Sequence, residues 1–180
     1  MSQDVPIITE WMDRVADFSV KYQKKNPHYK DWQTPPEYFA ELDKEFHFTM
    51  DAAASHENAL VSKYCTLDGT YSNTHGTPWA ISYSDGLTQS WKFERVFCNP
   101  PYDRTIIKWV AKAAQREAEV AVLLLPPSTD THWFHSYCWG QGEAQPEIRF
   151  LKKRLRFWKD GKVGSAPRAG NMLAIFRKEV

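Results

Sequence analysis

Apolar residues recur at helical spacing in several parts of the chain, and these parts are predicted to be helices. In residues 7–20 the apolar positions lie three to four residues apart, and a polar stretch with a proline follows, which favours a loop. Residues 34–46 and 105–119 carry similar stripes. The stripe residues are Trp11, Val15 and Phe18 in the first helix, Tyr38 or Phe39, Leu42 and Phe46 in the second, and Ile106, Val110, Ala113 and Ala114 in the third.

The second of these helices has a well-marked start. Thr34 can act as the N-cap, and Pro35 would occupy the first helical position, where a missing N–H costs nothing. Glu37 completes the pattern of a capping box. The sequence therefore predicts a helix that begins immediately after Thr34.

Shorter apolar runs between the helices predict strands. Residues 46–55 change to a period of two and end on small residues, which predicts a buried strand followed by a tight turn. Residues 120–125 are apolar on both faces, as in a central parallel strand. Further strands are expected within 59–66, 91–98, 147–158 and 171–178, and a loop-rich stretch at 68–90. This alternation predicts a three-layer α/β fold with a mostly parallel sheet, whose ligands lie at the carboxyl ends of the strands, where Asp51 and Asn99 fall.

The size and charge of the chain limit the possibilities further. With 180 residues and 20.9 kDa it is large enough for one domain with a substantial core. The net charge of +1 and the pI of about 7.7 neither require nor exclude a nucleic acid, so a basic surface would have to be local. Aromatic residues make up 14% of the chain and include eight Trp, which leaves rings available for stacking on bases.

The cysteines and the N-terminus bear on the cellular compartment. The three cysteines show no CxxC spacing, which favours a reducing compartment over a disulfide framework. The first residues lack the basic and apolar regions of a signal peptide, and no apolar run approaches the roughly 20 residues that span a bilayer. We therefore expect a cytoplasmic protein with no membrane partner.

The stretch Asn99-Pro100-Pro101-Tyr102 follows the strand predicted at 91–98. Two prolines fix two φ angles and remove two N–H groups, so the turn is stiff and its carbonyl groups point outward. The Asn99 side-chain oxygen and the Pro100 carbonyl can accept both hydrogens of an exocyclic amino group, and Tyr102 offers a ring face for stacking. Such acceptors favour the nucleophilic form of an aromatic amine. On these four residues alone, an ordinary Pro-Pro turn is the alternative.

This NPPY stretch resembles the catalytic motif of amino-methyltransferases, which transfer a methyl group from S-adenosylmethionine to adenine N6, cytosine N4 or an amide nitrogen. The wider chain is similar to the phage and prophage Dam-like DNA N6-adenine methyltransferases. Four segments carry this likeness in the family's order: DWQTPPEYFAELDKEFHFTMDAAASHENA, DGLTQSWKFERVFCNPPYD, LLLPPSTDTHWFH and SAPRAGNMLAIF. The resemblance implies a Rossmann-like methyltransferase fold encoded by a phage or prophage, with Asn99, Pro100, Pro101 and Tyr102 as catalytic residues.

The resemblance also implies a set of cofactor contacts. They are Trp32, Thr34, Pro35, Asp51, Ala52, Ala53, Asp85 and Asn99. Asp51 would face the methionine ammonium, although the following alanines stand where a glycine is usual and cannot take φ > 0 as readily. Asp85 would bind the cofactor adenine, with a plain Asp-Gly turn as the alternative. For Thr34 the alternative is a helix cap only.

Two further patterns are open to more than one interpretation. If residues 147–158 form a strand, one of its faces carries Leu151, Lys153, Leu155 and Phe157 and the other carries Lys152, Arg154, Arg156 and Trp158. The basic face could bind DNA phosphates, and Trp158 could insert between bases or stack on them. A charged edge strand that discourages aggregation is the alternative. The residues His132, His135 and Cys138 could suggest a metal, but a helix that covers the sheet explains their spacing better, and the family uses no metal.

We therefore expect an N-terminal helix and loop at residues 1–30 and one methyltransferase domain at 31–180. The expected function is transfer of a methyl group from S-adenosylmethionine to a flipped adenine in DNA, with no obligate protein partner. The alternatives are a catalytically degenerate nucleic-acid-binding protein, a cytosine-N4 methyltransferase and a protein-glutamine methyltransferase.

Overall fold

The computed structural model of the protein describes most of the predicted methyltransferase domain. Its described residues are 33–66, 81–83, 85–159, 162–164, 167 and 169–178, and side chains are left out at 81–83 and at position 143. The predicted helix at residues 7–20 and the predicted contact residue Trp32 lie outside them. The boundary at residue 31 and the N-terminal helix therefore stay predictions.

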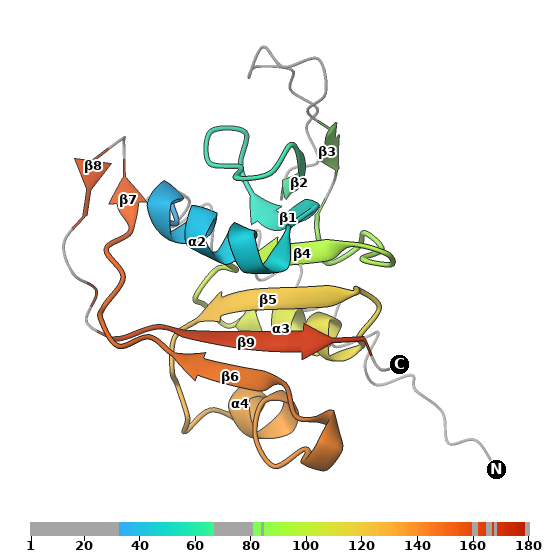
Figure 1. Cartoon of the computed structure of the whole chain (residues 1–180). Coiled ribbons are helices and arrows are strands. Elements are labelled where there is room, and N and C mark those ends of the chain that lie inside the picture. Colours follow the sequence, from blue (N-terminus) through green and yellow to red (C-terminus); the bar gives the residue numbers. More distant parts are fainter. Residues whose placement is uncertain are drawn as a thin grey trace. The chain divides into compact units, whose positions relative to one another are not determined.

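The described residues form a seven-stranded sheet with the order β3-β2-β1-β4-β5-β9-β6, and a separate two-stranded hairpin, β7-β8 (Figure 1). Strands β1 to β5 pair in parallel, whereas β9 pairs antiparallel with both β5 and β6. The strands are β1 Met50–Ala54, β2 Lys63–Thr66, β3 Ile81–Tyr83, β4 Arg95–Cys98, β5 Val120–Leu125, β6 Glu147–Phe150, β7 Trp158–Lys159, β8 Lys162–Val163 and β9 Met172–Arg177. The helices are α2 Pro36–Phe46, α3 Ile106–Ala114, α4 His132–Tyr137 and the 3-10 turn η2 Gly142–Ala144.

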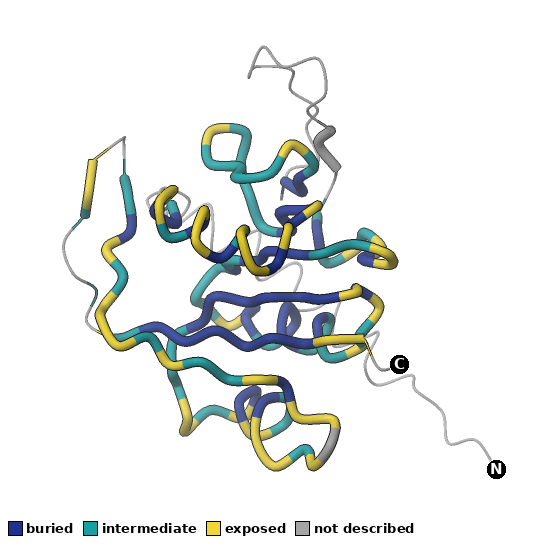
Figure 2. Tube along the Cα trace, viewed as in Figure 1, coloured by how far each residue is buried: buried dark blue, intermediate teal, exposed yellow. Residues whose placement is uncertain are grey.

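Helices cover both faces of the sheet, so the predicted three-layer α/β fold is confirmed. Helix α2 packs its buried Phe39, Leu42 and Phe46 on one face, and α3 and α4 cover the other (Figure 1). Strand β5 lies between them and is buried along its whole length, as its apolar sequence predicted (Figure 2). A Leu-to-Ala change in such a strand would cost about 2–5 kcal/mol of stability.

The start of α2 differs from the prediction. Pro35 is the N-cap in an extended conformation, with φ −56° and ψ 128°, and Pro36 is the first helical residue. A residue that precedes proline is disfavoured in the helical region, so Pro36 keeps Pro35 out of the helix. No side chain caps this helix, and the predicted roles of Thr34 as cap and Glu37 in a capping box are wrong.

Two strand predictions also need correction. Strand β1 includes the small residues, as predicted, but it begins only at Met50, four residues after the start of the predicted stretch 46–55. Strand β3 lies within the stretch predicted to be loop-rich. Both strands have parallel neighbours: β1 lies between β2 and β4, and β3 pairs with β2. Pairing with strands that are distant in sequence therefore decides the conformation of these residues.

The predicted strand at 147–158 is present only as β6, which ends at Phe150. Its partner β9 begins at Met172, opposite Phe150, and the last backbone bond runs from Leu151 N to Asn171 O at 3.0 Å. Among the described residues, no strand pairs with residues 151–157 beyond this point. Residues 151–157 therefore continue as irregular chain at the carboxyl edge of the sheet, and the predicted basic strand is wrong.

Candidate active site at the carboxyl edge of the sheet

Strands β1 and β4 pair in parallel at the point where the strand order reverses, so their carboxyl ends lie side by side. Asp51 is paired with Phe97, so Asn99 follows β4 close to the end of β1. The antiparallel β9 begins opposite Leu125, the last residue of β5, so Asn171 comes to the same edge. Ligands of open α/β sheets bind at such a reversal, and the predicted Asp51 and Asn99 are brought together there.

Asp51 is a buried carboxylate, with 3% of its surface exposed. Its two oxygens accept hydrogen bonds from Ala53 N at 3.3 Å and from Leu60 N at 3.2 Å. Burial raises the pKa of Asp51 to about 6, although these two N–H groups oppose the shift. A buried carboxylate with two neutral donors can still accept hydrogen bonds from a cation.

The Asp85-Gly86 turn is packed directly on β1. A Cβ atom at Gly86 would lie 2.0 Å from the Ala52 carbonyl oxygen, so only glycine fits against this strand. The Asp85 carboxylate accepts a hydrogen bond from Leu87 N at 3.0 Å, and Trp91 Nε1 donates to Gly86 O at 2.9 Å. The Asp-Gly turn that we considered as the alternative is thus present, and it holds Asp85 beside the small residues of β1. The binding roles of Ala52, Ala53 and Asp85 stay predictions.

Asn99 is connected to the segment that precedes α2. Its side-chain Nδ2 donates to the hydroxyl of the buried Thr34 at 3.2 Å. This bond directs the amide nitrogen toward Thr34 and leaves the amide oxygen for another partner. The same segment is anchored by backbone hydrogen bonds between Gln33 and Trp158, at 2.8 and 2.9 Å. Thr34 therefore reaches the site through Asn99, and Pro35 lies beside it.

Tyr102 is held by its hydroxyl group. The hydroxyl donates to the Leu124 carbonyl at 3.2 Å and accepts from Asn171 Nδ2 at 3.3 Å. Burial is the main reason why the pKa of Tyr102 is raised, so the group stays protonated. The ring meets Phe157 edge to face, with 6.3 Å between the ring centres. These contacts fix the plane of the ring while leaving Tyr102 partly exposed.

Asn171 was missed by the sequence analysis. It is 2% exposed and stands directly before β9, as Asn99 stands directly after β4. A polar amide at the end of an apolar strand was the signal that drew attention to Asn99. The same signal in the segment SAPRAGNMLAIF could have identified Asn171, had the antiparallel direction of β9 been known.

The residues predicted to bind DNA lie along the irregular chain after β6. Lys152, Arg154 and Arg156 are exposed, while Leu155 and Phe157 pack on the core. Trp158 is different, because its backbone pairs with Gln33 and its buried Nε1 has no hydrogen-bond partner among the described residues. The predicted exposure of these three cations is confirmed, but the predicted alternation is wrong at Lys153, which is exposed as well. Their contact with DNA stays a prediction.

The spacing of His132, His135 and Cys138 belongs to a helix that covers the sheet, as expected. Trp133 and Phe134 of α4 are buried in the core, and Cys138 at its end is also buried. Within the described ranges, no three His, Cys, Asp or Glu side chains gather closely enough to hold a metal ion.

Comparison with known protein families gives one match. The family model described as DNA N-6-adenine-methyltransferase (Dam) matches residues 21–179, nearly the whole chain. No protein with a curated description matches. In the part of the chain that the structure describes, no helix has the length and apolar character to cross a membrane.

Proposed function

Because the chain belongs to the Dam family of DNA N-6-adenine-methyltransferases, we propose that its carboxyl edge binds S-adenosylmethionine beside Asp51 and a flipped adenine beside Asn99. The cofactor is implied by the family, and it supplies a methyl group on a sulfonium centre that an amine can attack. The observation that carries the proposal is the placement of a buried carboxylate and the NPPY turn at one reversal of strand order.

The first half of the proposed site consists of Asp51, the alanines after it and the Asp85-Gly86 turn. The Asp51 carboxylate would accept hydrogen bonds from the ammonium group of the cofactor, and it has capacity for them beyond its two backbone donors. This role fits the buried carboxylate, because a cation beside a group with 3% exposure would stabilise its negative charge. Asp85 would accept from the adenine amino group of the cofactor.

The second half consists of Asn99 and the two prolines. With its Nδ2 held by Thr34, Asn99 would accept one hydrogen of the target amino group through its oxygen, and the Pro100 carbonyl would accept the other. These acceptors stabilise the tetrahedral amine that forms during attack more than the planar amine of the ground state. Pro101 would keep the turn rigid through its fixed φ. Their contribution is therefore to the rate of the chemical step.

An amino group inside a duplex cannot reach the cofactor, so the adenine has to leave the stack. Tyr102 would offer its ring face to the flipped base, which is worth about 1–3 kcal/mol per base. Lys152, Arg154 and Arg156 would neutralise phosphates of the strand, and Trp158 would support the turn in which they lie. If each cation makes one contact, its loss should reduce the slope of log affinity against log salt by about 0.9.

Methyl transfer to DNA tests this proposal directly. Purified protein with methyl-labelled S-adenosylmethionine and unmethylated DNA should give N6-methyladenine when the product is digested to nucleosides and measured by mass spectrometry. N4-methylcytosine without N6-methyladenine would contradict the acceptor assignment, and DNA binding without any turnover would favour a degenerate binding protein. The Asn99→Ala variant is the control, because it should produce no label in DNA while Asp51 and Asp85, the main proposed cofactor contacts, are unchanged.

A further inference from the structure

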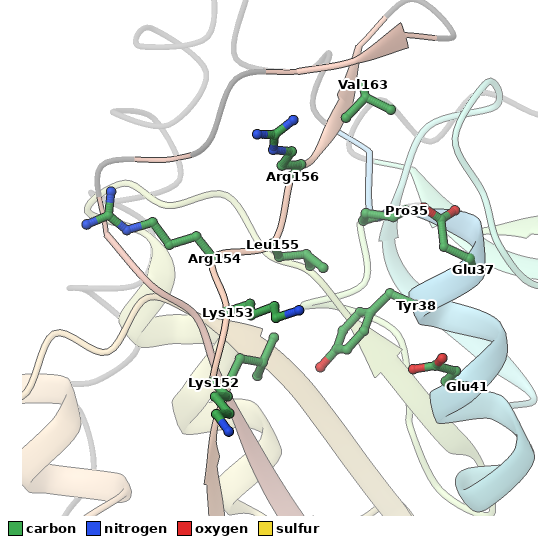
Figure 3. A pocket seen from close by; sticks show the side chains of 11 residues that line it. Pro35, Glu37, Tyr38, Glu41, Lys152, Lys153, Arg154, Leu155, Arg156 and Val163 are labelled. Carbon is green, nitrogen blue, oxygen red and sulfur yellow. The ribbon is translucent and has the colours of Figure 1, made fainter.

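A groove of about 470 Å³ lies between the first turns of α2 and the irregular chain after β6 (Figure 3). Helix α2 contributes Tyr38, Glu37 and Glu41, and the opposite side is formed by residues 151–156. Pro35 and Leu155 supply apolar surface inside it. Nothing in the assignment of catalytic, cofactor or phosphate contacts uses Tyr38, Glu41 or Lys153.

The groove adjoins the proposed site for the flipped base. Pro35, which lines it, directly follows Thr34, the hydrogen-bond partner of Asn99. On the other side, Leu151 and Leu155 pack against the same core cluster as the ring of Tyr102. Each side thus has a residue that is connected to the NPPY turn by a hydrogen bond or a shared cluster, and a DNA strand with its adenine at Asn99 would have its neighbouring nucleotides near the groove.

The basic side chains along the groove do not all point the same way. In Figure 3 the Lys153 side chain extends into the groove toward Tyr38, whereas Arg154 and Arg156 turn away from α2. The carboxylate of Glu41 lies near the Tyr38 hydroxyl from the next turn of the helix (Figure 3). Burial and the charge of Glu41 raise the pKa of Tyr38 to about 12, so its hydroxyl remains a donor.

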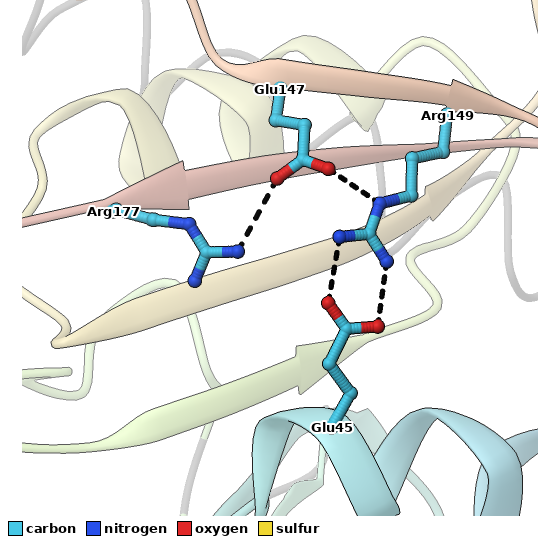
Figure 4. Close-up of polar contacts among 4 residues, drawn as sticks. All are labelled: Glu45, Glu147, Arg149 and Arg177. Atoms are coloured by element: carbon cyan, nitrogen blue, oxygen red, sulfur yellow. Dashed lines mark hydrogen bonds and ion pairs between the residues drawn. The ribbon is translucent and has the colours of Figure 1, made fainter.

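The two sides of the groove are joined by an ion-pair network (Figure 4). Arg149 of β6 makes two hydrogen bonds of 2.7 Å to Glu45 of α2, and Glu147 bridges Arg149 to Arg177. Bidentate pairs fix geometry better than single contacts do. Glu45 follows Glu41 by one helical turn, so the same stripe of α2 faces β6 and the groove. These ion pairs therefore join α2 to β6 beside the groove.

The chemistry of the groove argues for a base and against a phosphate. The cations of residues 151–156, which are Lys152, Lys153, Arg154 and Arg156, would attract a phosphodiester to their side of the groove, but Glu37 and Glu41 would repel it from the side formed by α2. A nucleobase instead offers donors and acceptors on one edge and apolar faces above and below it. Lys153 and Tyr38 can donate to such an edge, Glu41 can accept from it, and Pro35 and Leu155 can cover its faces.

We infer that the groove receives a nucleotide next to the flipped adenine, and that Lys153, Tyr38 and Glu41 contact its base and set the enzyme's preference for flanking sequence. This inference rests on the proposed function, because it requires the target adenine to lie at Asn99. It assigns different roles to two adjacent lysines. Lys153 contacts the base and contributes to sequence preference, whereas Lys152, which also lines the groove, contributes only phosphate attraction.

A competition experiment tests the inference. Duplexes with one fixed target adenine and randomised neighbours are methylated to low conversion, and the methylated fraction is sequenced for wild type and for the Lys153→Gln, Glu41→Gln and Tyr38→Phe variants. We expect the ratio between preferred and disfavoured flanking bases to fall by about fivefold to tenfold in Lys153→Gln and Glu41→Gln, and by less in Tyr38→Phe. The matched control Lys152→Gln should slow all sequences alike.

Cofactor affinity and melting temperature, measured on the same variants, separate a specificity effect from a folding defect. Flanking preferences identical to wild type in Lys153→Gln and Glu41→Gln would overturn the inference and leave the proposed function intact. An equal change in Lys152→Gln would also overturn it, because the effect would then be one of general charge. If the wild type methylates no adenine in any duplex, the proposed function and the inference both fail.

Discussion

The two halves of the proposed site are built from different chemistry, although they lie at the ends of neighbouring strands. The half at β1 contains Asp51, a buried ionisable group whose hydrogen-bond donors among the described residues are the backbone N–H groups of Ala53 and Leu60. The half at β4 and β9 contains Asn99, Tyr102 and Asn171, none of which carries a charge near neutral pH, and they are held mainly by other side chains.

The difference matches the ligand that we propose for each half. An ammonium group requires a negative charge, whereas the amino group of adenine requires oriented neutral acceptors and a flat surface. A charge costs free energy when buried, so the β1 half should respond to pH. Neutral amides and hydroxyls do not titrate in this range, so the other half should respond to changes in shape. Each of the following predictions tests one side of this contrast.

The largest effect is expected at Asn99. Removing the amide in Asn99→Ala should lower kcat by about 100- to 1,000-fold, as is typical for loss of one preorganised group that stabilises the transition state. Single-turnover methylation with saturating cofactor measures this. The Asn99→Asp variant is the matched control, because a carboxylate keeps an acceptor and should retain more activity. Equal loss in both variants would mean that the amide nitrogen, and not the oxygen, matters.

The second prediction concerns charge and pH at Asp51. The Asp51→Asn variant should bind S-adenosylmethionine about 10- to 100-fold more weakly at pH 8, because one charged hydrogen bond is lost. With a pKa of about 6 in the folded protein, wild type becomes protonated below pH 6, and its affinity should then fall by about tenfold per pH unit. The variant should show no such dependence. Calorimetric titrations between pH 5 and 8 measure both curves.

The same group gives an opposite effect on stability. Its pKa is higher in the folded protein than in the unfolded chain, where it is near 3.8, so the folded state retains a proton between about pH 4 and 6. The carboxylate therefore destabilises the fold above pH 6, and its contribution becomes more favourable as pH falls through this window. Asp51→Asn should lose this pH dependence and be more stable than wild type at pH 8. Urea unfolding at pH 5 and pH 8 measures the free energy of unfolding of both proteins. The same pH-dependent change in wild type and Asp51→Asn would contradict this prediction.

Local patterns identified most of the elements that build the site. The wholly apolar β5, the stripes of α2 and α3, and the NPPY turn after β4 carry their signals within a few residues of sequence. These signals reflect burial, because the spacing of apolar residues indicates which side chains face the core. The resemblance to the family then supplied the cofactor and the acceptor.

The contacts that complete the site depend on residues far apart in the chain, and the sequence did not reveal them. Thr34 meets Asn99, and Asn171 meets Tyr102, only because α2 and β9 return to the same edge of the sheet. The end of β6 is likewise decided by where β9 begins. A local pattern contains no information about where a distant partner strand starts, so the basic segment was predicted as a strand.

A smaller effect is expected from Thr34. In Thr34→Val the Asn99 amide loses the acceptor that orients it, so kcat should fall by about threefold to tenfold, in line with one neutral hydrogen bond. Cofactor affinity should change little. Thr34→Ser retains the hydroxyl and should restore most of the rate. If cofactor affinity falls instead of kcat, Thr34 contacts the cofactor directly, as the family resemblance implied.

The smallest effect on turnover is expected from the Tyr102 hydroxyl. Because the ring face is what would contact the base, Tyr102→Phe should lower kcat by no more than about threefold, whereas Tyr102→Ala should lose most activity. The hydroxyl instead joins Leu124 to Asn171, and its removal leaves two buried groups without this partner. The free energy of unfolding should therefore fall by about 1–2 kcal/mol.

A double-mutant cycle with Asn171→Ala shows whether Tyr102 and Asn171 stabilise the protein through their shared hydrogen bond. If the two residues stabilise the protein through their mutual hydrogen bond, the effects of Tyr102→Phe and Asn171→Ala on unfolding should not add, and the coupling should be about 1 kcal/mol. Urea unfolding of the four proteins measures it. Additive effects would mean that Asn171 acts independently of Tyr102. A large loss of turnover in Tyr102→Phe would instead place the hydroxyl in the chemical step, and the contrast between a charged half and a half that acts through shape would then need revision.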